Sequence, residues 1–266
     1  MKLENMEKAF QMLDETAAII EKECHCTYLE AIAETAENIF QGDVLQEELS
    51  EMSKKRLLKI YETVSFMDLD DETKRKAYQL CILKGMKQNI QPNHQMTPDS
   101  IGLFLSYLVR KCTDGQSSFR ILDPVGGTGN LLFTIMSQFK DKELISISSE
   151  VDDLLVKLAY SGANLLQYPV EFYNGDSIKP LMVDPVDIVV ADLPVGYYPD
   201  DVTAAEYEVK ADDEKTYAHH LIIEQSVRHL KAGGRGLFLV PNSIFESKQS
   251  GLLRDFLKKE CYIQGL

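Results

Sequence analysis

The sequence has few cysteines, a shortage of basic residues and no long apolar run. Five cysteines in 266 residues are too few to form the disulfide framework of a small secreted protein. No apolar stretch reaches the ~18–20 residues that a membrane-spanning helix needs. The polar start, residues 1–5, lacks the apolar core of a signal peptide. We therefore expect a cytoplasmic protein with no membrane segment.

Basic charge is in deficit throughout the chain. There are 28 lysines and arginines against 42 aspartates and glutamates, which gives a net charge of −14. Duplex DNA attracts basic protein faces, so this balance argues against unaided, charge-driven binding of DNA. A small local basic patch is still compatible with it.

Glycine and proline are nearly absent from residues 1–90, where apolar residues recur at helical spacing. The pattern predicts four helices, the third over about residues 44–58. We expect residues 1–90 to form a helical domain that selects the substrate, binds a partner or forms a homodimer. Cys24-His25-Cys26 lies in this segment, but no second pair of ligands has zinc-like spacing, so we expect no metal site.

From residue 119 onward, short apolar strands alternate with helices. The expected strands are 119–122, 144–148, 170–173, 186–191 and 236–240, and the expected helices are 129–139, 152–166, 214–231 and 247–259. This alternation predicts an α/β fold with a parallel sheet and right-handed crossovers. Ligands of such sheets bind at the carboxyl ends of the strands, so those junctions are the places to search.

The first junction is rich in glycine. A strand ends at Asp123, and the turn Pro124-Val125-Gly126-Gly127-Thr128-Gly129 opens a helix at Asn130. Glycine lets the backbone approach a ligand closely, and a helix N-terminus favours negative charge nearby. The spacing matches neither the Gly-x-Gly-x-x-Gly dinucleotide motif nor the phosphate-binding loop that ends in Gly-Lys-Ser/Thr. A plain turn is the alternative interpretation.

Three later junctions each carry an acid. Glu150 ends the second strand about 20 residues after the turn, where a carboxylate can accept hydrogen bonds from ribose hydroxyls. Asp176, followed by Ser177, comes after the third strand and can accept from an adenine amino group. Asp192 ends the fourth strand and precedes Leu193-Pro194-Val195 and two tyrosines. Each acid alone is compatible with a solvated turn, but four strand ends in order form a stronger signal.

These junctions resemble the class I S-adenosylmethionine-dependent methyltransferases, most closely the adenine-N6 branch and a bacterial group of adenine-specific DNA methyltransferase-like proteins. The resemblance covers about residues 91–266, the expected methyltransferase domain. It implies a Rossmann-like sheet with S-adenosylmethionine as the cofactor. The cofactor-binding residues that it implies are Thr97 (in Gln95-Met96-Thr97-Pro98), Asp123, Pro124, Gly126, Gly127, Thr128, Gly129, Asn130, Glu150, Asp176, Ser177 and Asp192.

The resemblance also identifies Asp192-Leu193-Pro194-Val195 with the family's Asn/Asp-Pro-Pro-Tyr/Phe catalytic tetrapeptide. An amine nitrogen with a delocalised lone pair is a poor nucleophile. Hydrogen bonds from its N–H groups to the Asp192 carboxylate and the Leu193 carbonyl would localise that pair for attack on a methyl group. Leu193 replaces a proline, and Val195 replaces the aromatic ring that stacks on an extruded base. Tyr197 or Tyr198 is expected to supply the ring.

The catalytic residues implied in this way are Asp192, Leu193, Pro194 and Tyr197. Three functions stay open. The chain is an N-methyltransferase that acts on adenine in nucleic acid, or a methyltransferase of the same fold that acts on a protein side-chain amide or a small molecule. The acidic charge and Val195 favour the second. The third is a binding or regulatory module that has lost turnover.

Four further features carry weaker expectations. The acidic stretch from Tyr198 to Glu214 is either a lid over the substrate or a solvated mobile loop. His219-His220 is expected to cap or pack a helix, and Asn242 is a candidate at the substrate edge. Class I sheets resemble one another in having seven strands, whereas only a start of a sixth is visible at residues 261–263. We therefore expect the methyltransferase domain to be truncated at its C-terminus.

Overall fold

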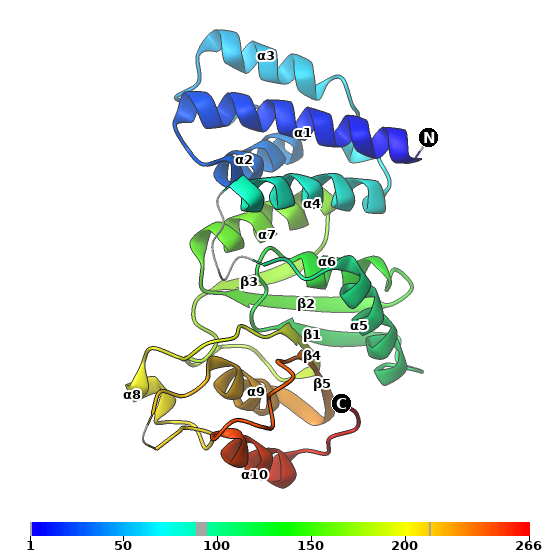
Figure 1. Cartoon of the computed structure of the whole chain (residues 1–266). Helices are drawn as coiled ribbons and strands as arrows, with labels where there is room; N and C mark the ends of the chain where they lie inside the picture. The colour runs from blue at the N-terminus through cyan, green and yellow to red at the C-terminus, as the bar shows by residue number, and fades with distance from the viewer. Residues whose placement is uncertain (1, 89–94, 213) are drawn as a thin grey trace. The chain divides into compact units, whose positions relative to one another are not determined.

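The computed structural model describes residues 2–88, 95–212 and 214–266 (Figure 1). The chain divides into two compact units that do not follow its order. The first spans residues 1–102, 127–140 and 152–170, and the second spans residues 103–126, 141–151 and 171–266. The expected break at residues 91–94 lies outside the described residues, so a domain boundary at residue 90 stays a prediction.

The first unit is built from helices. Its elements are α1 (Lys2–Cys24), α2 (Tyr28–Gln41), α3 (Glu51–Tyr61), the short 3-10 helix η1 (Phe66–Asp68), α4 (Asp71–Gln88), α6 (Asn130–Ser137) and α7 (Asp153–Leu166). A capping box begins α2: the Thr27 N–H donates to Glu30 Oε2 at 2.7 Å, and the Glu30 N–H donates to Thr27 Oγ1 at 3.3 Å. The helix ends where Gly42 adopts a φ of 73°.

The third helix is shorter than the apolar pattern predicts. The pattern places it over about residues 44–58, whereas α3 begins at Glu51 after the N-cap Ser50, whose Oγ accepts the Ser53 N–H at 3.2 Å. The preceding residues form a loop because the buried Asn38 side chain accepts the Leu45 N–H at 3.0 Å. A polar side chain from α2 therefore competes successfully with helix formation in this segment.

One apolar core joins the N-terminal helices to α7. Leu13 of α1 and Ile32 of α2 are fully buried in the same cluster as Leu158 of α7. The Tyr78 hydroxyl of α4 also donates to the Leu158 carbonyl oxygen at 2.9 Å. Burial of a leucine side chain contributes about 1.5–3 kcal/mol, so α7 depends on the N-terminal helices for much of its packing energy.

The second unit holds a five-stranded sheet in the order β3-β2-β1-β4-β5 (Figure 1). The strands are β1 (Ser118–Asp123), β2 (Glu143–Glu150), β3 (Val170–Asn174, whose first residue is counted with the first unit), β4 (Val186–Asp192) and β5 (Leu230–Leu239). Strand β1 is parallel to β2 and β4, and β4 is parallel to β5. The order reverses between β1 and β4, and such a switch point is where open α/β sheets bind ligands.

The helices outside the first unit complete this picture. They are α5 (Asp99–Cys112, whose first turn belongs to the first unit), α8 (Asp201–Ala204), α9 (Ala218–Arg228) and α10 (Ser250–Glu260). Ala191 of β4, Leu221 of α9 and Leu253 of α10 are buried in one apolar cluster. The predicted alternation of strands and helices is confirmed. No described helix is both long and apolar enough to cross a membrane.

Two predicted boundaries near the C-terminus are wrong. Strand β5 begins at Leu230 rather than at residue 236, because Leu230 already pairs with Val186 of β4 despite the glycines that follow it. Residues 261–266 form no strand, so the expected start of a sixth strand is absent. Tyr262 is 95% exposed there, and an apolar side chain left in water gives a strand nothing to pack against.

Candidate functional site

Asp123 ends β1 with 1% of its surface exposed. Its Oδ1 accepts the Val125 N–H at 3.1 Å, which holds the first bend of the glycine-rich turn. Burial, together with the nearby carboxylates of Glu150 and Asp192, raises the pKa of Asp123 to about 7. Asp123 therefore lies within electrostatic reach of the acids that end β2 and β4, as the switch point of the sheet requires.

Gly126 lies where only glycine fits. Its N–H donates to the Ser149 carbonyl oxygen at 2.9 Å, which ties the turn to the end of β2. A Cβ atom at this position would stand 1.9 Å from Ser148 Oγ. Pro124, between Asp123 and the glycines, is buried. The turn is thus drawn tightly onto the neighbouring strand within the second unit.

The rest of the turn belongs to the first unit, where Gly127 and Gly129 adopt φ values of 55° and 80°. These left-handed conformations favour glycine. Thr128 and Asn130 are buried, and the Asn130 Nδ2 donates to the Thr97 carbonyl oxygen at 2.8 Å. Two segments predicted to bind the cofactor, one around Thr97 and one at the start of α6, are therefore in direct contact.

Glu150 and Asp176 come from neighbouring strand ends. The Glu150 carbonyl oxygen accepts the Gly175 N–H at 2.9 Å, and its half-buried side chain accepts the Val151 N–H at 2.8 Å. Asp176 Oδ1 accepts the Ile178 N–H at 3.0 Å across the buried Ser177, while Oδ2 accepts the Tyr198 hydroxyl proton at 2.6 Å. Each carboxylate oxygen has a second lone pair, so both acids keep acceptor capacity.

The tetrapeptide mixes buried and exposed residues. Asp192 ends β4 and is exposed, as are Pro194 and Val195, the last at 69%. Leu193 is buried in the apolar cluster of α9, and its N–H donates to the Leu239 carbonyl oxygen at 3.2 Å. The loop therefore has a fixed anchor at Leu193 while its other three side chains reach solvent. Asn242 is exposed in the turn after β5.

A column of aromatic rings follows the tetrapeptide. Tyr197 is 54% exposed and stacks on Tyr217, with ring centroids 4.7 Å apart and planes at 13°. His219 also stacks on Tyr217, with ring centroids 5.0 Å apart, and His220 meets His219 edge-on at 4.8 Å. Tyr198 is buried, so of the two tyrosines that the sequence offers as a stacking ring, only Tyr197 presents its ring to solvent.

The two histidines confirm the predicted packing role, and one also contacts the tetrapeptide. Burial lowers the pKa of His219, although a hydrogen bond to the Pro194 carbonyl opposes that effect. Burial and the His219 ring lower the pKa of His220 to about 4, and neither ring nitrogen of His220 has a partner in the described part of the chain. Tyr217 and the contact of His219 with Pro194 were not predicted, because both join residues that lie at least 20 positions apart in the chain.

Part of the acidic stretch between Tyr198 and Glu214 is packed against the second unit, although most of its acidic side chains are exposed. Tyr207 and Val209 are buried, and the Val209 N–H donates at 2.9 Å to the buried Glu224 carboxylate of α9. The Tyr207 hydroxyl donates to the Ile178 carbonyl oxygen. The alternative of a freely solvated loop is therefore wrong for these residues, whereas Asp213 lies outside the described residues.

The Cys24-His25-Cys26 run lies where α1 ends and the chain turns toward α2, rather than inside a helix. His25 adopts a φ of 53° in this turn. Across residues 2–88, 95–212 and 214–266, no three side chains of His, Cys, Asp or Glu are grouped so that they could hold a metal ion.

The second unit offers hydrogen-bond acceptors that suit the donor groups of a nucleoside. Acceptor carboxylates at Glu150 and Asp176 match ribose hydroxyls and an adenine amino group. The close approach at Gly126 leaves no room for a side chain beside them. The Ser148 Oγ, which faces Gly126, is buried without a partner among the described residues. S-adenosylmethionine is the cofactor of the class I fold, and these residues are chemically suited to its adenosine half.

The comparisons with known proteins agree with this fold. A family model described as the YtxK N-terminal helical domain matches residues 7–86. The uncharacterized protein YtxK of Bacillus subtilis is 46% identical over 267 residues, which cover 100% of this chain and 81% of YtxK. A crystal structure from Listeria monocytogenes, assigned to the class I S-adenosylmethionine-dependent methyltransferases, is 43% identical with a TM-score of 0.90. That match covers 96% of this chain and 79% of the Listeria chain.

A more distant structure shares the fold alone. It is the methyltransferase subunit of a type I restriction-modification system from Streptococcus thermophilus, 16% identical with a TM-score of 0.66. The match covers 91% of this chain and 58% of that subunit. On the identity and coverage of the two nearer relatives, the chain belongs to the YtxK family, whose fold is that of the class I S-adenosylmethionine-dependent methyltransferases.

Proposed function

We propose that the chain is an S-adenosylmethionine-dependent N-methyltransferase that methylates the exocyclic amino group of adenine in nucleic acid. The observation that carries this proposal is the exposed carboxylate of Asp192. It ends β4, next to β1 and the glycine-rich turn, and the exposed Tyr197 ring follows five residues later. An acceptor for N–H groups and a flat ring therefore come from one short loop.

The cofactor would be held by the strand ends that carry acids. Glu150 would accept the ribose hydroxyls, and Asp176 with Ser177 would receive the adenine ring. Asp123 would act indirectly, because its buried carboxylate holds the Val125 N–H and so fixes the turn. The Tyr198 hydroxyl donates to Asp176 and would orient that carboxylate.

When bound, S-adenosylmethionine supplies a methyl group activated by a sulfonium. The acceptor amine would donate one N–H to the Asp192 carboxylate and the other to the Leu193 carbonyl oxygen. These bonds would localise the nitrogen lone pair and aim it at the methyl group. After transfer, the Asp192 carboxylate or water would accept the extra proton of the methylated nitrogen. Positioning and electrostatics supply most of the acceleration in such a reaction.

The aromatic column supports a planar acceptor. Stacking on an aromatic side chain contributes about 1–3 kcal/mol per base, and it holds a base that has left its helix. Tyr197 offers one open face because Tyr217 covers the other at 4.7 Å. The distant relationship in fold to a restriction-modification subunit favours nucleic acid as the source of that base.

A second candidate is methylation of a side-chain amide or a small molecule. The net charge of −14 opposes a phosphate backbone, and the aliphatic Val195, 69% exposed, stands where the family pattern has an aromatic ring. An amide is planar and has the same N–H donors, so the Asp192 and Leu193 contacts would serve it equally. Self-association through the N-terminal helices stays a prediction for either substrate.

The cofactor part of the proposal is tested by calorimetric titration of the full chain with S-adenosylmethionine and with S-adenosylhomocysteine. We expect saturable binding of both, with one site per chain. Absence of heat at millimolar cofactor, from protein shown to be folded by circular dichroism, would refute the proposed activity.

The acceptor is tested with methyl-labelled cofactor and separated DNA, RNA, protein and metabolite fractions of a bacterial lysate. We expect label in a nucleic acid fraction that nuclease releases and protease does not, with methylated adenine after complete digestion. Label that only protease or filtration removes would select the second candidate. Label in no fraction, despite cofactor binding, would favour a module without turnover.

A further inference from the structure

Arg75 lies in α4, within the segment that matches the YtxK helical-domain model, and its side chain is only 4% exposed. Its guanidinium makes two bonds to each of two carboxylates. Nε and Nη2 donate to Glu72 at 3.0 Å each, and Nη1 and Nη2 donate to Asp99 at 2.9 Å each. Paired bonds of this kind combine strength with a fixed geometry that a lysine does not reproduce.

The pair formed by Arg75 and Asp99 is strongly stabilised in its charged form. Burial by itself would lower the pKa of Arg75, but the bonds to Asp99 and Glu72 outweigh it and raise that pKa. Burial would likewise raise the pKa of Asp99, yet Arg75 holds it well below its usual range. The Gln79 amide also donates to Asp99, at 2.7 Å, so the carboxylate is oriented from two turns of α4. The pair is therefore a rigid, permanently charged element.

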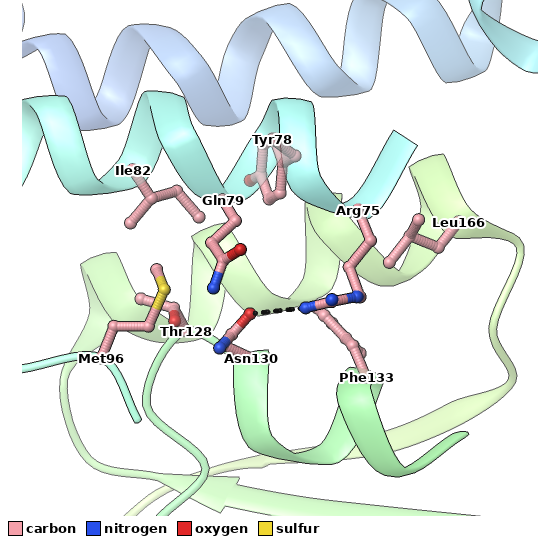
Figure 2. Close-up of a pocket in the computed structure, with 9 residues that line it drawn as sticks. All are labelled: Arg75, Tyr78, Gln79, Ile82, Met96, Thr128, Asn130, Phe133 and Leu166. Atoms are coloured by element: carbon pink, nitrogen blue, oxygen red, sulfur yellow. Dashed lines mark hydrogen bonds between the residues drawn. The ribbon is translucent and has the colours of Figure 1, made fainter. Parts of the chain in front are cut away.

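The same guanidinium reaches the helix that follows the glycine-rich turn. Its Nη1 donates to Thr134 Oγ1 at 3.1 Å. The same Nη1 donates to Asn130 Oδ1 at 3.4 Å (Figure 2). Asn130 in turn donates through Nδ2 to the Thr97 carbonyl oxygen at 2.8 Å. Figure 2 shows Arg75, Gln79 and Asn130 converging on one small pocket that Thr128 and Met96 also line.

We propose that Arg75 is a positioning residue for the cofactor, because it fixes both the segment at Thr97 and the turn at residues 127–130. This inference rests on the proposed function, since those two segments are predicted to bind the cofactor. It assigns the N-terminal helical domain a direct part in cofactor affinity, beyond any part in selecting the substrate. Loss of the guanidinium would free the amide of Asn130 to rotate and would loosen its bond to Thr97.

The test compares Arg75→Lys and Arg75→Met in the full chain with a control on the same domain, Arg56→Lys. Arg56 is a matched control because it makes one bond to Glu15 and its side chain is 62% exposed. Two quantities are measured: hydrogen exchange at the backbone amides of Thr97, Asp99 and residues 127–131 without cofactor, and the Kd for S-adenosylmethionine. A third variant, Gln79→Leu, removes one partner of Asp99 but leaves the guanidinium.

We expect faster exchange in those two segments for Arg75→Lys, unchanged exchange in α1 and α2, and a rise of about tenfold in Kd. Arg75→Met should give a larger rise, Gln79→Leu a smaller one, and Arg56→Lys none. Unchanged exchange in both segments, or an unchanged Kd in folded Arg75→Lys, would overturn the inference. If the wild-type chain binds no cofactor, the proposed function fails, and the exchange measurement still decides whether Arg75 orders the two segments.

Discussion

Two aspartates end neighbouring strands of one sheet, yet their surroundings differ completely. Asp123 of β1 is 1% exposed and holds the N–H of Val125, whereas Asp192 of β4 is exposed to solvent. Burial raises the pKa of Asp123 to about 7, so part of its population is protonated at neutral pH. The comparison teaches that identical side chains at equivalent strand ends can differ in role: Asp123 holds the backbone of the turn, and Asp192 reaches solvent, where we propose that it meets the methyl acceptor.

The largest expected effect comes from removing the exposed acid. Asp192→Ala should lower methyl transfer by about 10²–10³-fold, because the acceptor amine loses its main charged hydrogen-bond acceptor. Stability should change by less than about 1 kcal/mol, as is usual for an exposed side chain. Transfer of labelled methyl groups and urea unfolding measure the two quantities. The control is Asp201→Ala, an exposed acid on α8. Full activity of Asp192→Ala would contradict the proposed catalytic role of Asp192.

The buried acid should act on stability instead. Its pKa is about 7 in the folded chain and close to 3.8 when unfolded, so between these values the folded state binds more protons. The free energy of unfolding should then fall as pH rises from 4 to 7, by up to about 1.4 kcal/mol per pH unit from this group.

Asp123→Asn keeps an acceptor for the Val125 N–H and removes the titration. We therefore expect the decline in unfolding free energy between pH 4 and pH 7 to be shallower in the variant, measured by urea unfolding at each pH. Parallel curves for the two proteins would mean that Asp123 does not change its charge on folding within that range.

Tyr197, which follows Asp192 in the same loop, tests how the methyl acceptor is bound. Tyr197→Ala should raise the KM for a nucleic acid acceptor about tenfold, because one stacking surface of about 1–3 kcal/mol is lost. It should leave the Kd for the cofactor unchanged. Tyr262→Ala is the matched control, since it removes another exposed tyrosine ring, on the segment after α10 rather than on the loop after β4. A change in cofactor Kd with an unchanged KM in the Tyr197 variant would contradict the assignment.

The smallest expected effect comes from changing Glu150, whose exposure lies between that of Asp123 and that of Asp192. Glu150 is half-buried, and Glu150→Gln keeps an acceptor oxygen while removing the charge. We expect the Kd for S-adenosylmethionine to rise about threefold to fivefold, the cost of replacing charge-assisted hydrogen bonds by neutral ones. Glu143→Gln, at the exposed first residue of the same strand, should leave the Kd unchanged in the same calorimetric titration.

Two strand ends could be predicted from sequence because a buried apolar run stops at an aspartate and glycine follows three or four residues later: Asp123 ends β1, and Asp192 ends β4. Glu150 also ends its strand, β2, where serines alternate with apolar residues. The start of β5 could not be predicted, since Lys231 to Gly234 are unfavourable in a strand and form one only beside β4. Hydrogen bonding of a strand to its neighbour in the sheet depends on the backbone and produces no recognisable pattern in the local sequence.

The candidate site shows the same division. The glycine-rich turn and the acids are local patterns, so they can be recognised in the sequence. Arg75 is separated by 55 positions from Asn130, and nothing in the pattern of α4 distinguishes it from the neighbouring Lys74 and Lys76. Tyr217 reaches Tyr197 across 20 positions through a single antiparallel bridge. Contacts of this range depend on the folded chain.

The core that α7 shares with the N-terminal helices limits how this protein can be divided. Removing residues 1–88 would uncover Leu155, Leu158 and Leu165 and leave an apolar face of α7 in water. Exposure of three leucines would lower the free energy of unfolding by several kcal/mol, which is comparable to the net stability of many domains. We therefore expect residues 95–266 to fold poorly when they are produced without the N-terminal helices.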